Sequence, residues 1–92
     1  MDTLTQQQID AALADLDGWA FADGALTRTF RFADFPRAVD FVEQLADVAE
    51  SMGHHPDIDI RYNKVTLRLA THSAGGVTNR DVELAAALGC LA

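Results

Sequence analysis

Three histidines, all that the chain contains, are the side chains of this sequence best suited to move protons. His54 and His55 are neighbours between Gly53 and Pro56, and His72 follows further along the chain. Near neutral pH an imidazole accepts a proton in one form and donates it in the other, so it serves as a general base or a general acid. What these residues could do together depends on whether the fold brings the three rings to one place.

The His54-His55 pair follows an apolar helical pattern that ends at Gly53, and Pro56 favours extended backbone at the residue before it. Neighbouring side chains on extended backbone point to opposite sides. We therefore expect the two imidazoles to have separate tasks, one holding a ligand and the other moving a proton.

His72 follows a strand that we expect to pair with the strand beginning after Pro56. A turn at Asn63-Lys64 would join these two strands as an antiparallel hairpin. Because a hairpin returns the chain to the end of the sheet from which it started, we expect His72 to lie close to the histidine pair.

Two carboxylates are candidates to orient these rings. Glu50 lies one helical turn before His54. A carboxylate in the last turn of a helix is electrostatically unfavourable, which indicates that Glu50 orients an imidazole rather than being simply solvated. Asp81 follows Thr78 by the spacing of a capping box at the start of the last helix. A role for Asp81 in the site would add to that structural role.

Two other interpretations of the histidines stay open. Taken singly, a histidine at the end of a strand is more often solvated or locally hydrogen-bonded. A zinc ion held by His54, His55 and His72 is the more specific alternative to acid-base catalysis, because three imidazoles and a water form a known catalytic site. Adjacent histidines rarely bind the same metal ion, and no cysteine, aspartate or glutamate is spaced to complete a set of metal ligands. We therefore expect no bound metal.

Helical and strand patterns alternate along the chain. The expected elements are a helix between the cap Thr5 and Gly18, strands over residues 19–21 and 26–32 joined at Asp23-Gly24, a helix over residues 35–52, strands over residues 58–62 and 65–69, and a helix after Thr78. This order predicts an α+β fold of two layers, a four-stranded antiparallel sheet with the helices on one face. We expect residues 1–92 to form a single domain.

Apolar residues predict which surfaces are buried. The expected buried face of the helix over residues 35–52 comprises Phe35, Val39, Val42, Leu45, Ala46, Ala49 and Met52. In the first hairpin, the aromatic residues cannot all lie under the helices if the strands keep their alternation; these are Trp19, Phe21, Phe30 and Phe32. We therefore expect some apolar surface or a sheet edge to be covered by another copy, in a homodimer or homotetramer.

Composition narrows the range of partners. The net charge is -7 and the 7 Lys and Arg residues are scattered, which argues against nucleic acid because phosphate backbones are bound by clustered cations. No stretch has the roughly 18 consecutive apolar residues of a membrane span, and residues 1–10 lack a signal-peptide pattern. We expect a cytoplasmic protein without membrane contact, whose single cysteine stays unpaired.

The spacing of the candidate residues resembles the signature of the pterin-4a-carbinolamine dehydratases. Its anchors are Glu50, the run His54-His55-Pro56, Tyr62, His72 and Asp81. The segments YNKVTLRLATHSAGG and GVTNRD and the early Gly-Trp pair are also similar to family sequences, so the likeness covers nearly the whole chain. Gly53 departs from the pattern, because many relatives carry an acidic or polar residue there, and any pterin contact at this position would come from backbone.

The resemblance implies an enzyme that removes water from 4a-hydroxytetrahydropterin (4a-hydroxytetrahydrobiopterin) and yields quinonoid dihydropterin, with no metal or organic cofactor. The residues that it implicates are His54, His55 and His72 for acid-base chemistry and pterin binding, Glu50 and Asp81 to orient them, and Gly53, Thr71 and Ser73 to line the pocket. We choose His55 and His72 as the proton-transfer pair, and which of them is the acid stays open.

The setting implied by the resemblance is the recycling of a pterin cofactor. Aromatic amino acid hydroxylases use that cofactor, so one of them is an expected candidate partner beside the small-molecule pterin. Relatives also act as dimerisation partners of transcription factors. A non-enzymatic interaction module on the same fold is therefore the alternative.

Overall fold

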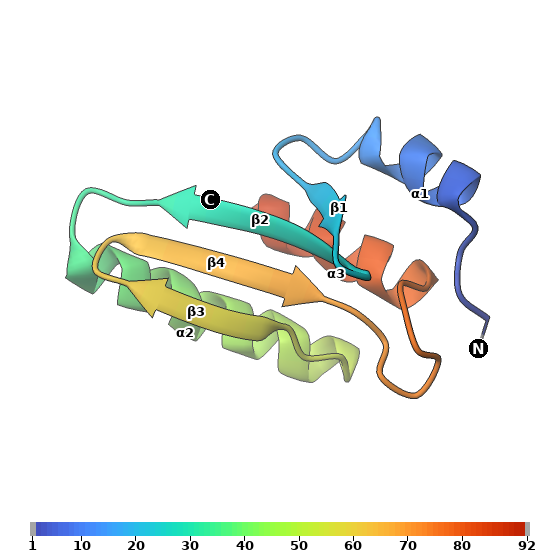
Figure 1. Ribbon diagram of the computed structural model, residues 1–92. Helices are drawn as coiled ribbons and strands as arrows, with labels where there is room; N and C mark the ends of the chain where they lie inside the picture. The colour runs from blue at the N-terminus through green and yellow to red at the C-terminus, as the bar shows by residue number, and fades with distance from the viewer. Residues whose placement is uncertain (1, 92) are drawn as a thin grey trace.

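The computed structural model describes residues 2–91. Its elements are α1 (Gln6–Leu13), β1 (Ala20–Ala22), β2 (Ala25–Arg31), α2 (Phe35–Met52), β3 (Asp57–Arg61), β4 (Lys64–Leu69) and α3 (Asn79–Gly89). Figure 1 shows α2 and α3 lying together behind the four strands. The predicted α+β class, with an antiparallel sheet and helices on one face, is confirmed. Within the described range no helix is long and apolar enough to cross a membrane.

The strands are ordered β1-β2-β4-β3 and every neighbouring pair is antiparallel, so each hairpin supplies one central and one edge strand. The central strands β2 and β4 pair from Leu26 opposite Leu69 to Arg31 opposite Lys64. Their inner face carries fully buried side chains that pack under the helices. The second hairpin places the start of β3 beside the end of β4, which brings the segments that flank these strands together.

The ends of α2 are set by residues at its two caps. Asp34 Oδ1 accepts the N–H of Arg37 at 3.0 Å, and Pro36 lies in the first turn, where its missing N–H costs nothing. At the other end Gly53 has a φ of 63°, a left-handed conformation that glycine adopts without strain. This cap turns the chain towards the end of the sheet and directs the following histidines there.

The prediction for the aromatic residues of the first hairpin is wrong. The turn between β1 and β2 places Phe21 directly opposite Leu26, and opposite residues of an antiparallel pair share a face. The same parity puts the other aromatic residues on that inner face: Trp19, Phe30 and Phe32. The outer face is polar, as shown by the bond of 2.9 Å between the hydroxyls of Thr29 and Thr66.

The buried face of α2 is rotated from the predicted one. Leu45 and Ala49 are buried as expected, but Phe41 joins them, whereas Phe35 is 49% exposed and Ala46 is also exposed. The apolar stripe of α2 is wider than the surface that the sheet offers, so the position of the sheet decides which part of the stripe is covered.

Element boundaries also differ from the predictions, by one residue in each strand and by more at the end of α1. α1 ends at Leu13, and the chain reaches Gly18 through turns rather than through further helix. The second hairpin turns at Tyr62-Asn63, one residue earlier than expected, because Tyr62 leaves the strand with a left-handed φ of 53°. Tyr62 is therefore exposed at the tip of the hairpin.

Candidate active site

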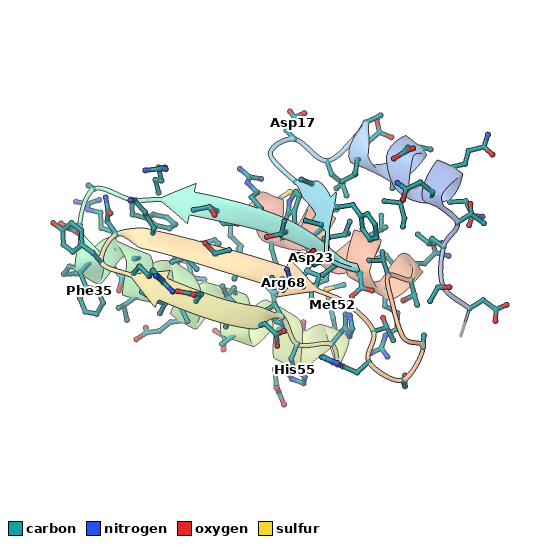
Figure 2. The ribbon with its side chains drawn as sticks, viewed as in Figure 1. Asp17, Asp23, Phe35, Met52, His55 and Arg68 are labelled. Carbon is teal, nitrogen blue, oxygen red and sulfur yellow. The ribbon has the colours of Figure 1, made fainter. Side chains whose placement is uncertain are left out.

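Three segments meet at one end of the sheet and form the candidate site. They are the chain leaving α2, the end of β4 with the loop behind it, and the first turn of α3. A hollow of about 370 Å³ at this place is lined by Gly53, His54, His55, Pro56, Asp57, Ala70, Thr71, His72, Ser73 and Arg80. Figure 2 shows His55 there, just beyond the end of α2 that Met52 marks. The structure thus brings the three imidazoles to one hollow, together with the other residues expected to line it.

His54 is the buried member of the histidine pair. Its Nε2 lies 2.5 Å from Oδ1 of Asp81, whose side chain is fully buried. A carboxylate only accepts hydrogen bonds, so Nε2 of His54 donates and Nδ1 is the ring nitrogen left for another partner. Asp81 therefore fixes both the tautomer and the orientation of this ring.

The second oxygen of Asp81 joins a buried network. Oδ2 accepts the hydroxyl of Thr71 at 2.9 Å and the backbone N–H of Thr78 at 2.9 Å. The two threonine hydroxyls are bonded to each other at 2.8 Å, and that of Thr78 also accepts the N–H of Arg80 as the cap of α3. Both oxygens of the buried carboxylate are satisfied, which is what allows a charge to lie inside the core.

His55 lies on the solvent side of the same segment. Its Nε2 donates to Oε2 of Glu50 at 2.8 Å, and the two side chains are 63% and 79% exposed. Exposed ion pairs contribute only about 0–1 kcal/mol to stability, so the main effect of Glu50 is to orient the ring. The two neighbouring imidazoles thus lie in different surroundings, as extended backbone predicts.

His72 is carried by a tight loop between β4 and α3. Thr71 and Gly76 form an isolated bridge in which the N–H of Thr71 donates to the carbonyl of Gly76 at 2.8 Å. Gly75 closes the turn with a φ of 80°. His72 and Ser73 are exposed on this loop and form one rim of the hollow.

Two charged residues of the hollow were not predicted from the sequence. Nη2 of Arg80 donates to the carbonyl of Gly53 at 2.6 Å and so ties the first turn of α3 to the end of α2. A cation in the first turn of a helix is electrostatically unfavourable, and that signal could have identified Arg80. Asp57, the first residue of β3, carries no comparable signal, because acidic residues alternate with apolar ones along that strand.

The arrangement suits proton transfer to and from a small polar ring. Two imidazoles are oriented through Nε2 and retain Nδ1, and a third lines the hollow from the loop after β4. Among residues 2–91, no three His, Cys, Asp or Glu side chains are grouped so that they could hold a metal ion.

Two threonine caps of the same type offer a matched test of the buried network. Thr5 and Thr78 each form a capping box, but Thr5 is exposed and Thr78 is fully buried against Thr71. We expect Thr5→Ala to lower the free energy of unfolding by about 1 kcal/mol and Thr78→Ala by about 2–3 kcal/mol, because the latter also removes a buried hydrogen bond to the hydroxyl of Thr71. Urea unfolding of both variants measures the difference, and equal losses would contradict the role given to the network.

The fold and the site together define a class of small α+β proteins in which paired histidines after a helix meet a third histidine from a loop. A family model described as pterin 4 alpha carbinolamine dehydratase matches residues 2–90 of the chain. The protein belongs to this family.

Relatives and solved structures agree with this assignment. A protein of Mycobacterium avium (strain 104), provisionally named pterin-4-alpha-carbinolamine dehydratase, is 56% identical over 92% of this chain and 90% of its own length. One of the same provisional name from Chloroflexus aurantiacus (strain J-10-fl) is 50% identical over 96% of this chain and 95% of its own length. The crystal structure of a transcriptional coactivator/pterin dehydratase from Brucella melitensis has a TM-score of 0.94 and 42% identity over 99% of both chains.

A more distant structure shares the fold alone. It is a pterin dehydratase-like protein identified as a RuBisCO assembly factor in the alpha-carboxysome, with a TM-score of 0.65. Its identity to this chain is 22%, over 79% of this chain and 84% of its own. The same architecture is therefore found in a protein with an assembly role.

Proposed function

We propose that this protein catalyses the dehydration of 4a-hydroxytetrahydropterin to quinonoid dihydropterin. The observation that carries the proposal is one hollow lined by three imidazoles, two of which are bonded to carboxylates. Membership of the pterin carbinolamine dehydratase family supports the same reaction.

The reaction requires two proton transfers. One imidazole donates a proton to the 4a hydroxyl, the bond from C4a to oxygen breaks, and water leaves. A second imidazole takes the proton from N5, whose electrons form the double bond between C4a and N5. We assign the transfers to His55 and His72, because both are exposed in the hollow and exchange protons with water between turnovers.

His54 has a different task in this proposal. Its ring is buried and fixed by Asp81, so it suits binding of the pterin through Nδ1. The hydroxyl of Thr71 is already used by Asp81, whereas that of exposed Ser73 remains for the ligand. The backbone of Gly53 lines the hollow beside Arg80.

A dehydration assay tests the proposal directly. Purified protein is mixed with freshly generated 4a-carbinolamine, and formation of the quinonoid product is followed by absorbance against the protein-free rate. We expect acceleration that persists in the presence of a metal chelator. A rate equal to the protein-free rate would count against a dehydratase, and activity that chelator abolishes and zinc restores would favour a metal mechanism instead.

An interaction module is the second candidate function. It is favoured by the apolar side chains exposed along β3 and by the coactivator role named for the Brucella melitensis protein. This candidate predicts a protein that binds its partner equally well when His55 and His72 are replaced by alanine. A protein without dehydratase activity and with such binding would establish it.

We also propose that the free edge of β3 pairs with a second copy of the chain. β3 is an edge strand that exposes apolar side chains. Within it Ile58 and Ile60 are 42% and 39% exposed, and Tyr62, which follows it, is 68% exposed. An apolar edge strand is a template for pairing with another strand. Phe35 of α2 is a further large apolar side chain exposed in the described part of the chain.

Charge favours one register for that pairing. On β3, Arg61 Nε and Asp59 Oδ1 are 3.2 Å apart on one face. An antiparallel pair with its two-fold axis at Ile60 places Asp59 of each copy opposite Arg61 of the other, so four charges alternate in sign. An axis at Asp59 would instead place the two Asp59 carboxylates opposite each other, which is unfavourable.

A charge on this edge should separate the copies. We expect wild-type protein to be dimeric or larger at micromolar concentration and Ile60→Lys to be monomeric in sedimentation velocity. Ala86→Lys, a matched change on the exposed face of α3, should keep the wild-type mass. Arg61→Asp should weaken association and Asp59→Lys with Arg61→Asp should restore it. A monomeric wild type, or an Ile60→Lys variant of unchanged mass, would contradict the proposed interface.

A further inference from the structure

A second hollow lies away from the histidines, between the segment that leads from α1 to β1, strand β2 and the last turn of α3. We call it the Trp19 hollow. Among residues 2–91, none lines both this hollow and the candidate active site. In Figure 2, Asp17 marks the segment before β1, far from His55. The volume of about 310 Å³ is at the lower end of the range for ligand pockets, about 300–1,000 Å³, so a small molecule suits it.

Two nitrogen donors lie side by side in the Trp19 hollow. Nε1 of Trp19 is buried, and within residues 2–91 it has no hydrogen-bond partner. A Cβ atom at Gly89 would lie 3.8 Å from this nitrogen and 3.5 Å from Nη1 of Arg28. A buried donor without a partner costs free energy, so this place is suited to an acceptor that comes from outside the described chain.

The positive charge of Arg28 is available at the same place. Its guanidinium lies 4.2 Å from the ring centre of Phe30, and Nη1 donates to the backbone carbonyl of Asp17 at 2.9 Å. These contacts hold the half-buried side chain in position, yet within the described residues no carboxylate forms an ion pair with it. A guanidinium in this setting binds a carboxylate through parallel hydrogen bonds.

Gly89 leaves the space against these donors open. It is the last residue of α3, and glycine weakens a helix relative to alanine. Its φ is not positive, and a Cβ atom would meet its neighbours at ordinary contact distances, so neither backbone conformation nor crowding requires a glycine here. The effect of the missing side chain is room for a ligand beside Trp19 and Arg28.

The exposed part of the lining has the opposite charge. The carboxylates of Asp15 and Asp17 belong to it, and both residues are exposed. The C-terminal end of α3 borders the same hollow, and its partial negative charge favours a cation. Leu16 and Ala85 add buried apolar surface. The hollow therefore offers a place for an anion, a place for a cation and an apolar wall.

We propose that the Trp19 hollow binds a free aliphatic α-amino acid. The carboxylate of the ligand accepts hydrogen bonds from the Arg28 guanidinium and, once this long side chain turns towards the ligand and uncovers the indole, from Nε1 of Trp19. The ammonium group faces Asp15, Asp17 and the end of α3. A carboxylate without an ammonium group would meet the two aspartates with no compensation, and an amine without a carboxylate would leave the donors unused. This inference does not depend on the dehydratase function.

Binding is measured by calorimetry and by the emission of Trp19, the single tryptophan of the chain. The probes are L-leucine, 4-methylpentanoate, which lacks the ammonium group, and 3-methylbutylamine, which lacks the carboxylate. They are titrated into wild type, into Gly89→Asn, whose added side chain fills the space against both donors, and into Ala46→Asn. Ala46 is exposed on α2 and does not line the Trp19 hollow, so this change is the matched control.

We expect L-leucine to bind wild type and Ala46→Asn with a Kd of about 1 mM, and its binding to Gly89→Asn to be at least about ten-fold weaker. Each analogue should bind wild type at least about ten-fold more weakly than leucine, because it loses one charge-assisted contact. An analogue that binds as tightly as leucine would overturn the recognition of both charges, and unchanged binding by Gly89→Asn would overturn the location. Absence of saturable leucine binding at about ten times that Kd would overturn the amino acid site as a whole.

Discussion

The variant His55→Ala/His72→Ala is expected to lower kcat for dehydration by about 10³-fold, and each single variant by about 10²-fold. General acid-base catalysis by one positioned side chain is worth about 10²- to 10⁴-fold in rate. Because the acid and the base act in one reaction, the effects of the two substitutions need not multiply. Residual activity is expected, because in the proposed site His54, held in place by Asp81, is left to bind the pterin.

Folding should be unaffected in these variants, which makes the comparison clean. Both side chains are exposed, and among residues 2–91 the side-chain bond that His55 loses is the one to exposed Glu50. Asp47→Ala, an exposed change on α2, serves as the matched control and should keep the wild-type rate. Stopped-flow measurement of product formation gives the rates, and circular dichroism reports the fold. A double variant as fast as wild type would contradict the assignment of proton transfer to His55 and His72.

Asp81→Ala should produce the largest loss of stability, about 3–5 kcal/mol in the free energy of unfolding. The substitution removes a fully buried carboxylate that bonds three groups: the ring of His54, the hydroxyl of Thr71 and the N–H of Thr78. Each of these donors would then lose its bond to the carboxylate within a largely buried network, which is the costly case.

Chemical unfolding in urea measures this loss. Asp81→Asn keeps the shape and one acceptor oxygen, so we expect a smaller loss than for alanine. Glu83→Ala, two residues along α3 and exposed, should stay within about 0.5 kcal/mol of wild type. An Asp81→Ala variant within about 1 kcal/mol of wild type would show that the network is not needed for folding.

Local signals in the sequence identified the elements of the fold well. The caps at Thr5, Asp34 and Thr78 depend on side chains that bond to neighbouring backbone, and all three form as predicted. The order of the hairpins and helices then defined the sheet. Contacts between distant segments were harder to predict from the sequence. Phe35 and Phe41 are both apolar residues of α2, and only the position of the sheet decides that Phe41 is buried and Phe35 is not.

In the candidate site, too, the features set by local sequence could be predicted and those set by the packing of distant segments could not. Convergence of His72 on the histidine pair could be predicted, because a hairpin dictates where its two ends meet. The clamp from Arg80 to Gly53 could not be placed from spacing, since its formation depends on how a long side chain reaches between two helices. That His54 is buried and His55 exposed likewise depends on where α3 docks, although their separation was expected.

The loop that carries His72 is anchored in the core at both of its ends and is closed in between by bonds of its own backbone. Thr71 and Thr78 are held in the core, whereas residues 73–75 lie outside it, where they form the turn and Ser73 lines the candidate site. Short surface turns with fixed ends tolerate replacement at small thermodynamic cost. Substitutions in residues 73–75 could therefore change which ligand this fold binds and leave the core, and so the fold, unchanged.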